Sequence, residues 1–181
     1  NRAADFVTTD QPTKGAQNPE ITVPFGTVVP AVTGIGFSDN QPDFDAIIRT
    51  DVGEAMNDIN ASIWSRLEFQ VGDLPPVDLL TLRMKYDDGF VAYLNGVEVA
   101  RRNALDPLEY NSNATAAHPN AQAVVFEDID VSEHIVDTLQ VGTNVLAIHG
   151  LNLSPGDEDF LLMPELIASS SVNDPQYMTA P

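Results

Sequence analysis

The chain of 181 residues contains no cysteine, and this absence excludes several kinds of site at once. Disulfide bonds, thiolate zinc sites, iron–sulfur clusters and a cysteine nucleophile all require that residue. Only three histidines occur, and they form neither an HExxH pair nor part of a nucleophile-elbow motif. The phosphate-binding patterns GxxxxGK[ST] and GxGxxG are missing too. We therefore expect neither a catalytic role nor a nucleotide cofactor.

Positive charge is scarce, since 8 Lys and Arg residues stand against 27 Asp and Glu residues for a net charge of −19. Nucleic acid and anionic membrane surfaces need clustered Lys or Arg, so neither is an expected partner. No apolar run approaches the roughly 18 residues of a membrane-spanning helix, and we expect no membrane insertion. The acidity indicates solubility in a salty or extracellular medium, or binding of calcium by some of the carboxylates.

The segment Leu82–Asn103 predicts β structure most clearly. Asn95-Gly96 separates two alternating runs, and this dipeptide tolerates the positive φ angles of a type I′ turn. A β-hairpin is therefore predicted over Phe90–Arg101. Just upstream, Asp87-Asp88-Gly89 predicts a second sharp turn, which would make a three-stranded meander of this part of the chain.

Four further strands are predicted from apolar alternation or from continuous apolar runs: residues 62–71, 123–131, 142–153 and 160–169. The last is apolar on both faces and is expected to be central. Ser132 is predicted to cap one helical turn, and a short helix or loop is predicted within Asp51–Asn60.

Residues 1–30 contain four prolines and are predicted to form an N-terminal arm with one or two edge strands. Residues 31–168 are predicted to form the domain, and 169–181 a C-terminal tail or linker. Within the domain, residues 103–120 form a long loop without a clear period, and such loops are usually functional or mobile. Many strands and little helix predict an all-β, antiparallel β-sandwich of jelly-roll type with one or two short helical turns.

Two segments, YDDGFVAYLNGVEVARRN (residues 86–103) and FEDIDVSEHIVDTLQVGTNVLAIHGLN (residues 126–152), together resemble galactose-binding-like β-sandwich modules. Such modules are accessory domains of secreted multimodular bacterial proteins, and the resemblance spans about residues 34–168. It implies an extracellular or cell-surface location, neighbouring domains in the same polypeptide, frequent sugar binding and often one structural calcium ion. The fold itself is also compatible with protein binding or a structural role.

Sugar recognition needs an exposed aromatic ring flanked by hydrogen-bonding side chains. Trp64 is the first candidate, because strand alternation places it on the polar face. The second is Tyr110 in the long loop. The side chains that would flank the two rings are Arg66 and Glu68 for the first, and Asn111 and Asn113 for the second. The alternative is that the rings pack against a loop or a neighbouring domain.

The histidines are expected to have no catalytic part. His149 alternates with apolar residues along a strand, which indicates a core histidine, and His118 in the long loop is expected to be solvated. Asp87 and Asp88 are interpreted as turn residues, and the acidic loop 157–159 as solvated.

Glu165 in the last strand has apolar neighbours, so its carboxylate needs a cationic partner. The resemblance implies that a last-strand acidic residue helps to hold the structural calcium, and Glu165 is the matching position. The other ligands would come from an early loop, with candidates Asp39, Asn40, Asp43 and Asp45, or Asp5 and Asp10 nearer the start of the chain. An ion pair with Arg83 or Arg66 is the alternative.

The leading hypothesis is a non-catalytic carbohydrate-binding module of a secreted or cell-surface protein, which binds a polysaccharide or glycan and tethers a neighbouring catalytic domain. The alternative is a structural subunit of an extracellular filament or surface layer. In that case, self-assembly would use the N-terminal arm to add a strand to the next subunit's sheet.

Overall fold

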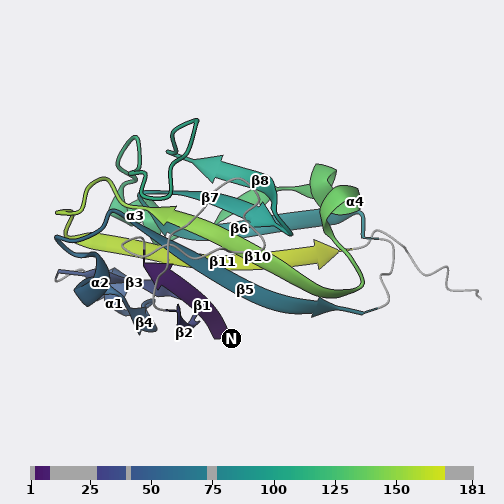
Figure 1. The fold of residues 1–181 in the computed structure, drawn as a ribbon, viewed down its shortest axis with the longest axis horizontal. Helices are drawn as coiled ribbons and strands as arrows, with labels where there is room; N and C mark the ends of the chain where they lie inside the picture. The colour runs from purple at the N-terminus through teal and green to yellow at the C-terminus, as the bar shows by residue number, and fades with distance from the viewer. Residues whose placement is uncertain (1–2, 9–27, 40–41, 73–76, 170–181) are drawn as a thin grey trace, which may run out of the picture.

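The computed structural model describes residues 3–8, 28–39, 42–72 and 77–169, with the backbone alone for 3–8 and 28–32. These residues form two β-sheets that pack face to face (Figure 1). The predicted all-β antiparallel sandwich is confirmed. None of the helices in these ranges is long and apolar enough to span a bilayer.

The first sheet has six strands in the order β2-β1-β5-β10-β7-β8. They are β1 (Ala3–Thr8), β2 (Val28–Val32), β5 (Ser62–Val71), β7 (Gly89–Leu94), β8 (Val97–Arg102) and β10 (Gly142–Leu151). The predicted hairpin is β7–β8, and its turn residues Asn95 and Gly96 have φ angles of 49° and 87°. These positive values confirm the type I′ turn expected from the dipeptide.

The second sheet has five strands in the order β4-β3-β11-β6-β9, with β11 in the predicted central position. They are β3 (Ile35–Ser38), β4 (Thr50–Asp51), β6 (Leu79–Asp87), β9 (Glu127–Asp130) and β11 (Asp159–Ser169). Only the short β3–β4 pair among the described pairings is parallel. The sheet thus joins strands from widely separated parts of the sequence.

Short helices occupy the connections. They are α1 (Pro42–Asp45), α2 (Gly53–Met56), α3 (Asn120–Ala123), the 3₁₀ turn η1 (Ser132–His134) and α4 (Ile135–Thr138). A helical turn does begin at Ser132, but Ser132 does not cap it. Its Oγ instead accepts a hydrogen bond from the backbone N–H of Leu80 at 3.0 Å, which ties η1 to β6.

One hydrophobic core lies between the sheets, and both contribute to it through alternate side chains. Leu82 and Met84 of β6 face Phe90 of β7 and Ile148 of β10 across this interior, all with no more than 1% exposure. The ring of Phe160 fits against Gly150, where a Cβ atom would lie only 2.6 Å from its Cζ. The core therefore depends on a close approach of the two sheets.

The predicted meander is wrong at the Asp87-Asp88-Gly89 turn. β6 pairs with β11 and β9, whereas β7 pairs with β10 and β8 in the other sheet. The turn therefore carries the chain across the core instead of along one sheet. The chain crosses between the sheets at every connection from β5 to β11 except the β7–β8 hairpin, as in a jelly roll.

The N-terminal arm contributes strands to the chain's own sheet. β1 lies between β2 and β5, so β2 is the edge strand and β1 is interior. The remainder of the predicted arm, at residues 9–27, and the predicted tail beyond Ser169 lie outside the described residues.

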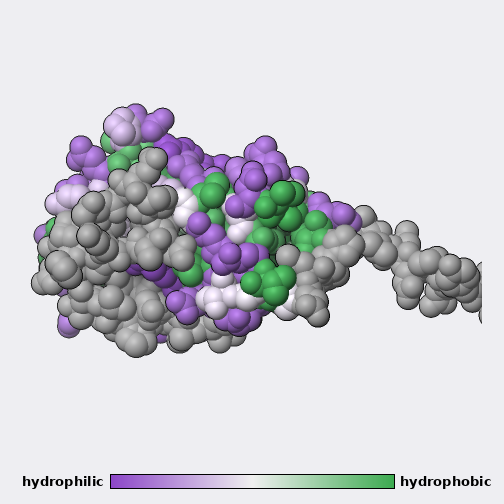
Figure 2. Space-filling model, turned by 45° about the vertical axis from the view of Figure 1, so that its right-hand side comes forward, coloured by the Kyte–Doolittle hydropathy of each residue, from purple (hydrophilic) through white to green (hydrophobic). Residues whose placement is uncertain are grey.

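Five of the ten exposed large apolar side chains among the described residues lie at the end of the sandwich that carries α4: Leu79, Val97, Val136, Val141 and Ile167. Val136 is the most exposed, at 91%. Figure 2 shows hydrophobic surface toward this end. The candidate functional site lies at the opposite end.

Candidate functional site

The loops after β3, β6, β8 and β10 emerge together, because the strands that they follow or precede are antiparallel neighbours. We call this end of the sandwich the loop end, and define it by residues 42–61, 87–89, 103–120 and 152–158. In Figure 1 it lies at the left, around α1, α2 and α3. Connecting loops on a rigid scaffold are where binding residues are commonly placed.

A pocket of about 520 Å³ opens at the loop end. Carboxylates dominate its wall: Asp39, Asp45, Asp51 and Glu158. Phe37 and Ile48 supply apolar surface, and Ser38 and Asn57 add uncharged polar groups. Its volume falls within the roughly 300–1,000 Å³ of small-molecule sites. It can therefore accept a ligand rich in hydrogen-bond donors.

Hydrogen bonds hold the pocket wall in place. The N–H of Asp39 donates to the carbonyl of Glu158 at 2.9 Å, which joins the loop after β3 to the loop before β11. Ser38 Oγ donates to Asp45 Oδ1 at 2.9 Å, and Asp51 Oδ1 accepts from the N–H of Gly53 at 2.8 Å. The two loops are thus joined at the pocket, and the carboxylates of Asp45 and Asp51 each accept a hydrogen bond that orients them.

Trp64 does not lie on a solvent-exposed face, and that prediction is wrong. Its side chain is fully buried, with its ring stacked on His149 at 4.2 Å between centroids and 13° between planes. The ring of Tyr93 also stacks on Trp64, at a centroid distance of 6.1 Å. Arg66 is half-buried, and Glu68 alone of the first candidate group is exposed. The Trp64 ring is therefore a packing element and is not offered to a ligand.

Tyr110 lies in the long loop and is 37% exposed, as expected for the second candidate ring. Asn111 is also exposed, whereas Asn113 Nδ2 donates to the carbonyl of Leu153 at 3.1 Å. The loop passes over the start of β5, where Ser62 Oγ lies 3.5 Å from the carbonyl oxygen of Tyr110. The structure thus brings the loop that carries Tyr110 close to the start of β5, and of the two candidate rings only that of Tyr110 is accessible.

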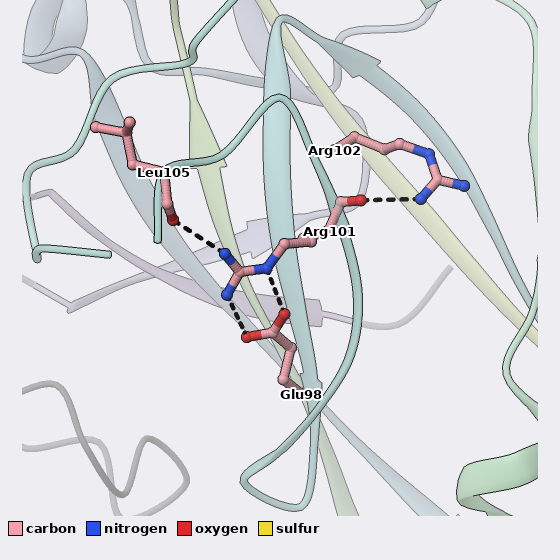
Figure 3. A network of polar contacts seen from close by, with 4 residues as sticks. All are labelled: Glu98, Arg101, Arg102 and Leu105. Atoms are coloured by element: carbon pink, nitrogen blue, oxygen red, sulfur yellow. Dashed lines mark hydrogen bonds and ion pairs between the residues drawn. The ribbon is translucent and has the colours of Figure 1, made fainter. Parts of the chain in front are cut away.

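Arg101 anchors the beginning of this loop (Figure 3). Its guanidinium group donates to both carboxylate oxygens of Glu98, at 2.6 and 2.8 Å, and to the carbonyl of Leu105 at 3.0 Å. The neighbouring Arg102 donates to the carbonyl of Arg101 at 2.8 Å. A two-point contact of this kind orients the side chain as well as attracting it. It fixes where the loop leaves β8.

His149 is fully buried, which confirms the prediction of a core histidine. Burial lowers its pKa to about 3, while the backbone of Tyr110 acts in the opposite direction. The expectation for His118 is wrong. Its ring stacks on Tyr86 at 4.2 Å between centroids, and its Nδ1 lies 2.8 Å from the Tyr86 carbonyl oxygen. His118 therefore attaches the long loop to β6.

The described residues among the predicted calcium ligands lie in different places: Asp39 and Asp45 line the same pocket, whereas Glu165 is not part of its lining. Glu165 pairs with Arg83 at 2.9 Å, which is the alternative that the sequence left open. Asp39 and Asp45 line the pocket, Asp43 is exposed on α1, and Asn40 lies outside the described residues. Within the ranges that the structure covers, no three His, Asp or Glu side chains are arranged to hold a metal ion.

Replacing Glu165 with glutamine tests the ion pair against the calcium prediction. Arg83 retains its 2.7 Å contact with Asp128, and both members of the Glu165 pair are about one-third exposed or more. We expect the free energy of unfolding to fall by less than about 1 kcal/mol, equally with calcium and with EGTA. Thermal unfolding in both buffers measures this, with Glu98→Gln as the matched ion-pair control. A loss seen only with calcium would show that Glu165 is a metal ligand.

Asp87 and Asp88 form a buried link between loops, a role that sequence reasoning missed. Asp88 Oδ1 and Oδ2 accept the backbone N–H groups of His118 and Leu153, each at 2.8 Å. Its carbonyl accepts from Asn103 Nδ2 at 2.9 Å. The turn after β6 thus fastens both long loops of the loop end. Two adjacent aspartates that are both nearly buried go beyond ordinary turn chemistry.

No protein-family model and no curated protein matches the chain. Solved structures similar to it include an α-L-rhamnosidase from Streptomyces avermitilis in complex with L-rhamnose, at 21% identity and a TM-score of 0.42. That match covers 61% of this chain and 9% of the enzyme. A β-glucuronidase from Ruminococcus gnavus has 16% identity, a TM-score of 0.44 and coverage of 83% and 20%.

A β-glucuronidase from an uncultured Clostridium species gives nearly the same values: 16% identity, a TM-score of 0.42, and coverage of 84% of this chain and 21% of that one. The chain thus spans between about a tenth and a fifth of the length of these enzymes. With TM-scores below 0.5, these likenesses support no inference about the activity of this chain.

Proposed function

We propose that this chain is a non-catalytic carbohydrate-binding module whose ligand occupies the acidic pocket at the loop end. The observation that carries the proposal is the lining of that pocket, which combines four carboxylates with the apolar side chains of Phe37 and Ile48. Sugar hydroxyl groups donate hydrogen bonds to carboxylates, and the C–H faces of a sugar ring pack on apolar surface. The chemistry of the wall and the chemistry of a saccharide are therefore complementary.

The charge of the pocket narrows the class of saccharide. Asp39, Asp45, Asp51 and Glu158 bring negative charge to its wall, and the described residues that line it include neither Lys nor Arg. The whole chain adds to this field with its net charge of −19. Like charges repel, so a uronic-acid or sulfated polysaccharide is a poor ligand. A neutral or amino-bearing oligosaccharide fits best.

Tyr110 supports the proposal from a neighbouring part of the loop end. Its exposed ring offers a stacking surface, and the exposed Asn111 beside it offers both a donor and an acceptor. A module of this kind acts by holding a neighbouring domain near its polysaccharide, which raises effective concentration without tight binding. An extracellular or cell-surface location belongs to the same proposal.

Removing single carboxylates from the pocket is expected to weaken binding of a neutral or amino-bearing oligosaccharide. Glu158→Gln and Asp45→Asn each replace a charged acceptor with a neutral one at nearly constant shape. A hydrogen bond to a charged group contributes about 1.5–3 kcal/mol, so binding should weaken about ten- to a hundredfold. Affinity electrophoresis followed by isothermal titration calorimetry measures this loss.

Asp137→Asn on α4 is the matched control, since Asp137 is exposed at the far end of the sandwich and its replacement removes the same charge. Tyr110→Ala tests the neighbouring ring separately. Binding that is unaffected by both pocket variants but lost in Tyr110→Ala would move the site to the long loop. Binding to none of a broad panel of glycans would overturn the proposed function.

A further inference from the structure

Asp87 is a buried acidic residue whose carboxyl group is not fully hydrogen-bonded within the described part of the chain. Its side chain is 2% exposed, and its Oδ2 has no hydrogen-bond partner among the described residues. Burial is the largest cause that raises its pKa, to about 10, followed by the hydrogen bond and the charge of Asp88. An isolated buried carboxylate is too costly to persist as an anion. A proton or a cation must therefore neutralise the carboxylate of Asp87.

Among the described residues, the charged groups that act on Asp87 are all carboxylates. Asp88 faces it from the same turn, Asp159 from the start of β11, and Asp157 from the preceding loop. The long loop contributes His118, whose N–H is bound to Asp88 and whose ring nitrogen Nδ1 is bound to the Tyr86 carbonyl. No Lys or Arg of the described residues pairs with any of these carboxylates.

The neighbours are placed as acceptors. Both oxygens of Asp88 already receive backbone N–H groups, so they act as acceptors. Asp159 Oδ2 accepts a hydrogen bond from Asn120 at 2.6 Å. The pKa of Asp159 is raised, with burial as the largest cause, and the hydrogen bonds from Asn120 and Asp87 act against this shift. Both neighbours therefore offer acceptor oxygens, and Asp87 is the most deeply buried of the three carboxyl groups.

We propose that Asp87 is a neutral carboxylic acid whose proton, hydrogen-bonded to the carboxylates of Asp88 and Asp159, latches the loop end closed, and that loss of this proton releases the latch. The proton stays on Asp87 in the closed state and leaves to solvent in the open one. No other bond changes. A protonated Asp87 carries no charge and can donate a hydrogen bond to a neighbouring carboxylate, which lowers the repulsion among the three carboxyl groups.

The latch reaches the acidic pocket through the chain. Asp157 and Asp159 flank Glu158, which lines the pocket and whose carbonyl holds the N–H of Asp39. Repulsion that displaces residues 157–159 would displace this pocket wall. The latch does not depend on the proposed function, since it is a property of the folded chain without ligand.

Asp87→Asn tests the latch, because the amide is neutral at every pH and keeps the shape of the side chain. A group whose pKa is higher in the folded state than in the unfolded state stabilises the fold. This contribution is complete below the unfolded-state pKa near 3.8 and is lost as the pH rises toward the folded-state pKa. The folding equilibrium constant of the wild type, divided by that of D87N, should fall about tenfold per pH unit from about pH 6 to about pH 9. Urea unfolding at each pH measures this ratio.

Asp137→Asn is the control, and its ratio to the wild type should stay constant over the same range. A constant ratio for D87N as well would overturn the proposal. So would an increase in wild-type melting temperature on adding calcium that EGTA reverses and D87N lacks, because a cation would then neutralise the cluster.

A second measurement applies even if D87N does not fold. Carbon-13 spectra of aspartate carboxyl groups in the wild type should show one carboxyl that remains protonated at neutral pH. In Asp159→Asn, where one charged neighbour is gone, that carboxyl should titrate at a lower pH. Complete titration of every aspartate below about pH 6 in the folded wild type would contradict the latch.

Discussion

Trp64→Ala is expected to lower the free energy of unfolding by about 3–5 kcal/mol, the range found for deletion of a large buried aromatic side chain. The Trp64 ring is fully buried and stacks on His149, its direct cross-strand neighbour on β10. Its removal leaves a cavity beside the stack and exposes a histidine that is itself completely buried. Urea unfolding followed by far-ultraviolet circular dichroism measures the loss, since the chain has no second tryptophan to report fluorescence.

Tyr110→Ala is the matched control for this effect, because the Tyr110 ring is 37% exposed. Its stability should change by no more than about 0.5 kcal/mol. Trp64→Phe should lie between the two, since it keeps an aromatic ring and loses an indole N–H that has no partner among the described residues. A Trp64→Ala protein as stable as the wild type but unable to bind glycan would return Trp64 to the ligand site.

Gly36→Ala is expected to destabilise the domain by about 3 kcal/mol and to abolish binding at the pocket. A Cβ atom at Gly36 would lie 2.2 Å from the carbonyl oxygen of Phe160 and 3.3 Å from Ile48 Cγ1. The first of these is a backbone atom of β11, so the clash cannot be relieved by turning a side chain. β3 would have to separate from β11 at the point where it leads into the pocket wall.

Gly72→Ala makes the same chemical change at a position where no atom of the described residues lies within 4 Å of the added methyl group. It should alter stability by no more than about 0.5 kcal/mol and leave binding intact. Urea unfolding and calorimetry on the two variants measure both effects. Equal stability of the two proteins would mean that β3 and β11 can move apart freely, against the close pairing described above.

The local features of the fold follow from the sequence because their causes are local. The Asn95-Gly96 turn depends on two φ angles, and the alternation along β5 and β6 depends on a side-chain period of two. The central place of β11 was also predictable, since its residues are apolar on both faces. Each of these predictions needs only neighbouring residues.

Which strands pair with one another cannot be predicted from such local patterns. Alternation is the same whether β6 pairs with β7 or with β11, so the turn at Asp87 could be interpreted as a meander although the chain crosses the core there. The same limit applies to Trp64. Strand alternation places the Trp64 side chain on the other face of the sheet from Ile63. No local pattern reveals that this outer face is covered, so that Trp64 is buried there.

The candidate site also depended on long-range contacts. The pocket joins residues 37–57 to Glu158, and the latch joins Asp87 to Asp159 across 72 positions of the chain. Glu165 likewise finds Arg83, its cross-strand neighbour on β6. Residue types and periods determined which segments become strands and which become turns, because those choices are made over a few residues. Only the tertiary structure decided which carboxylates meet and which ring is buried, because both depend on contacts between segments that are distant in the chain.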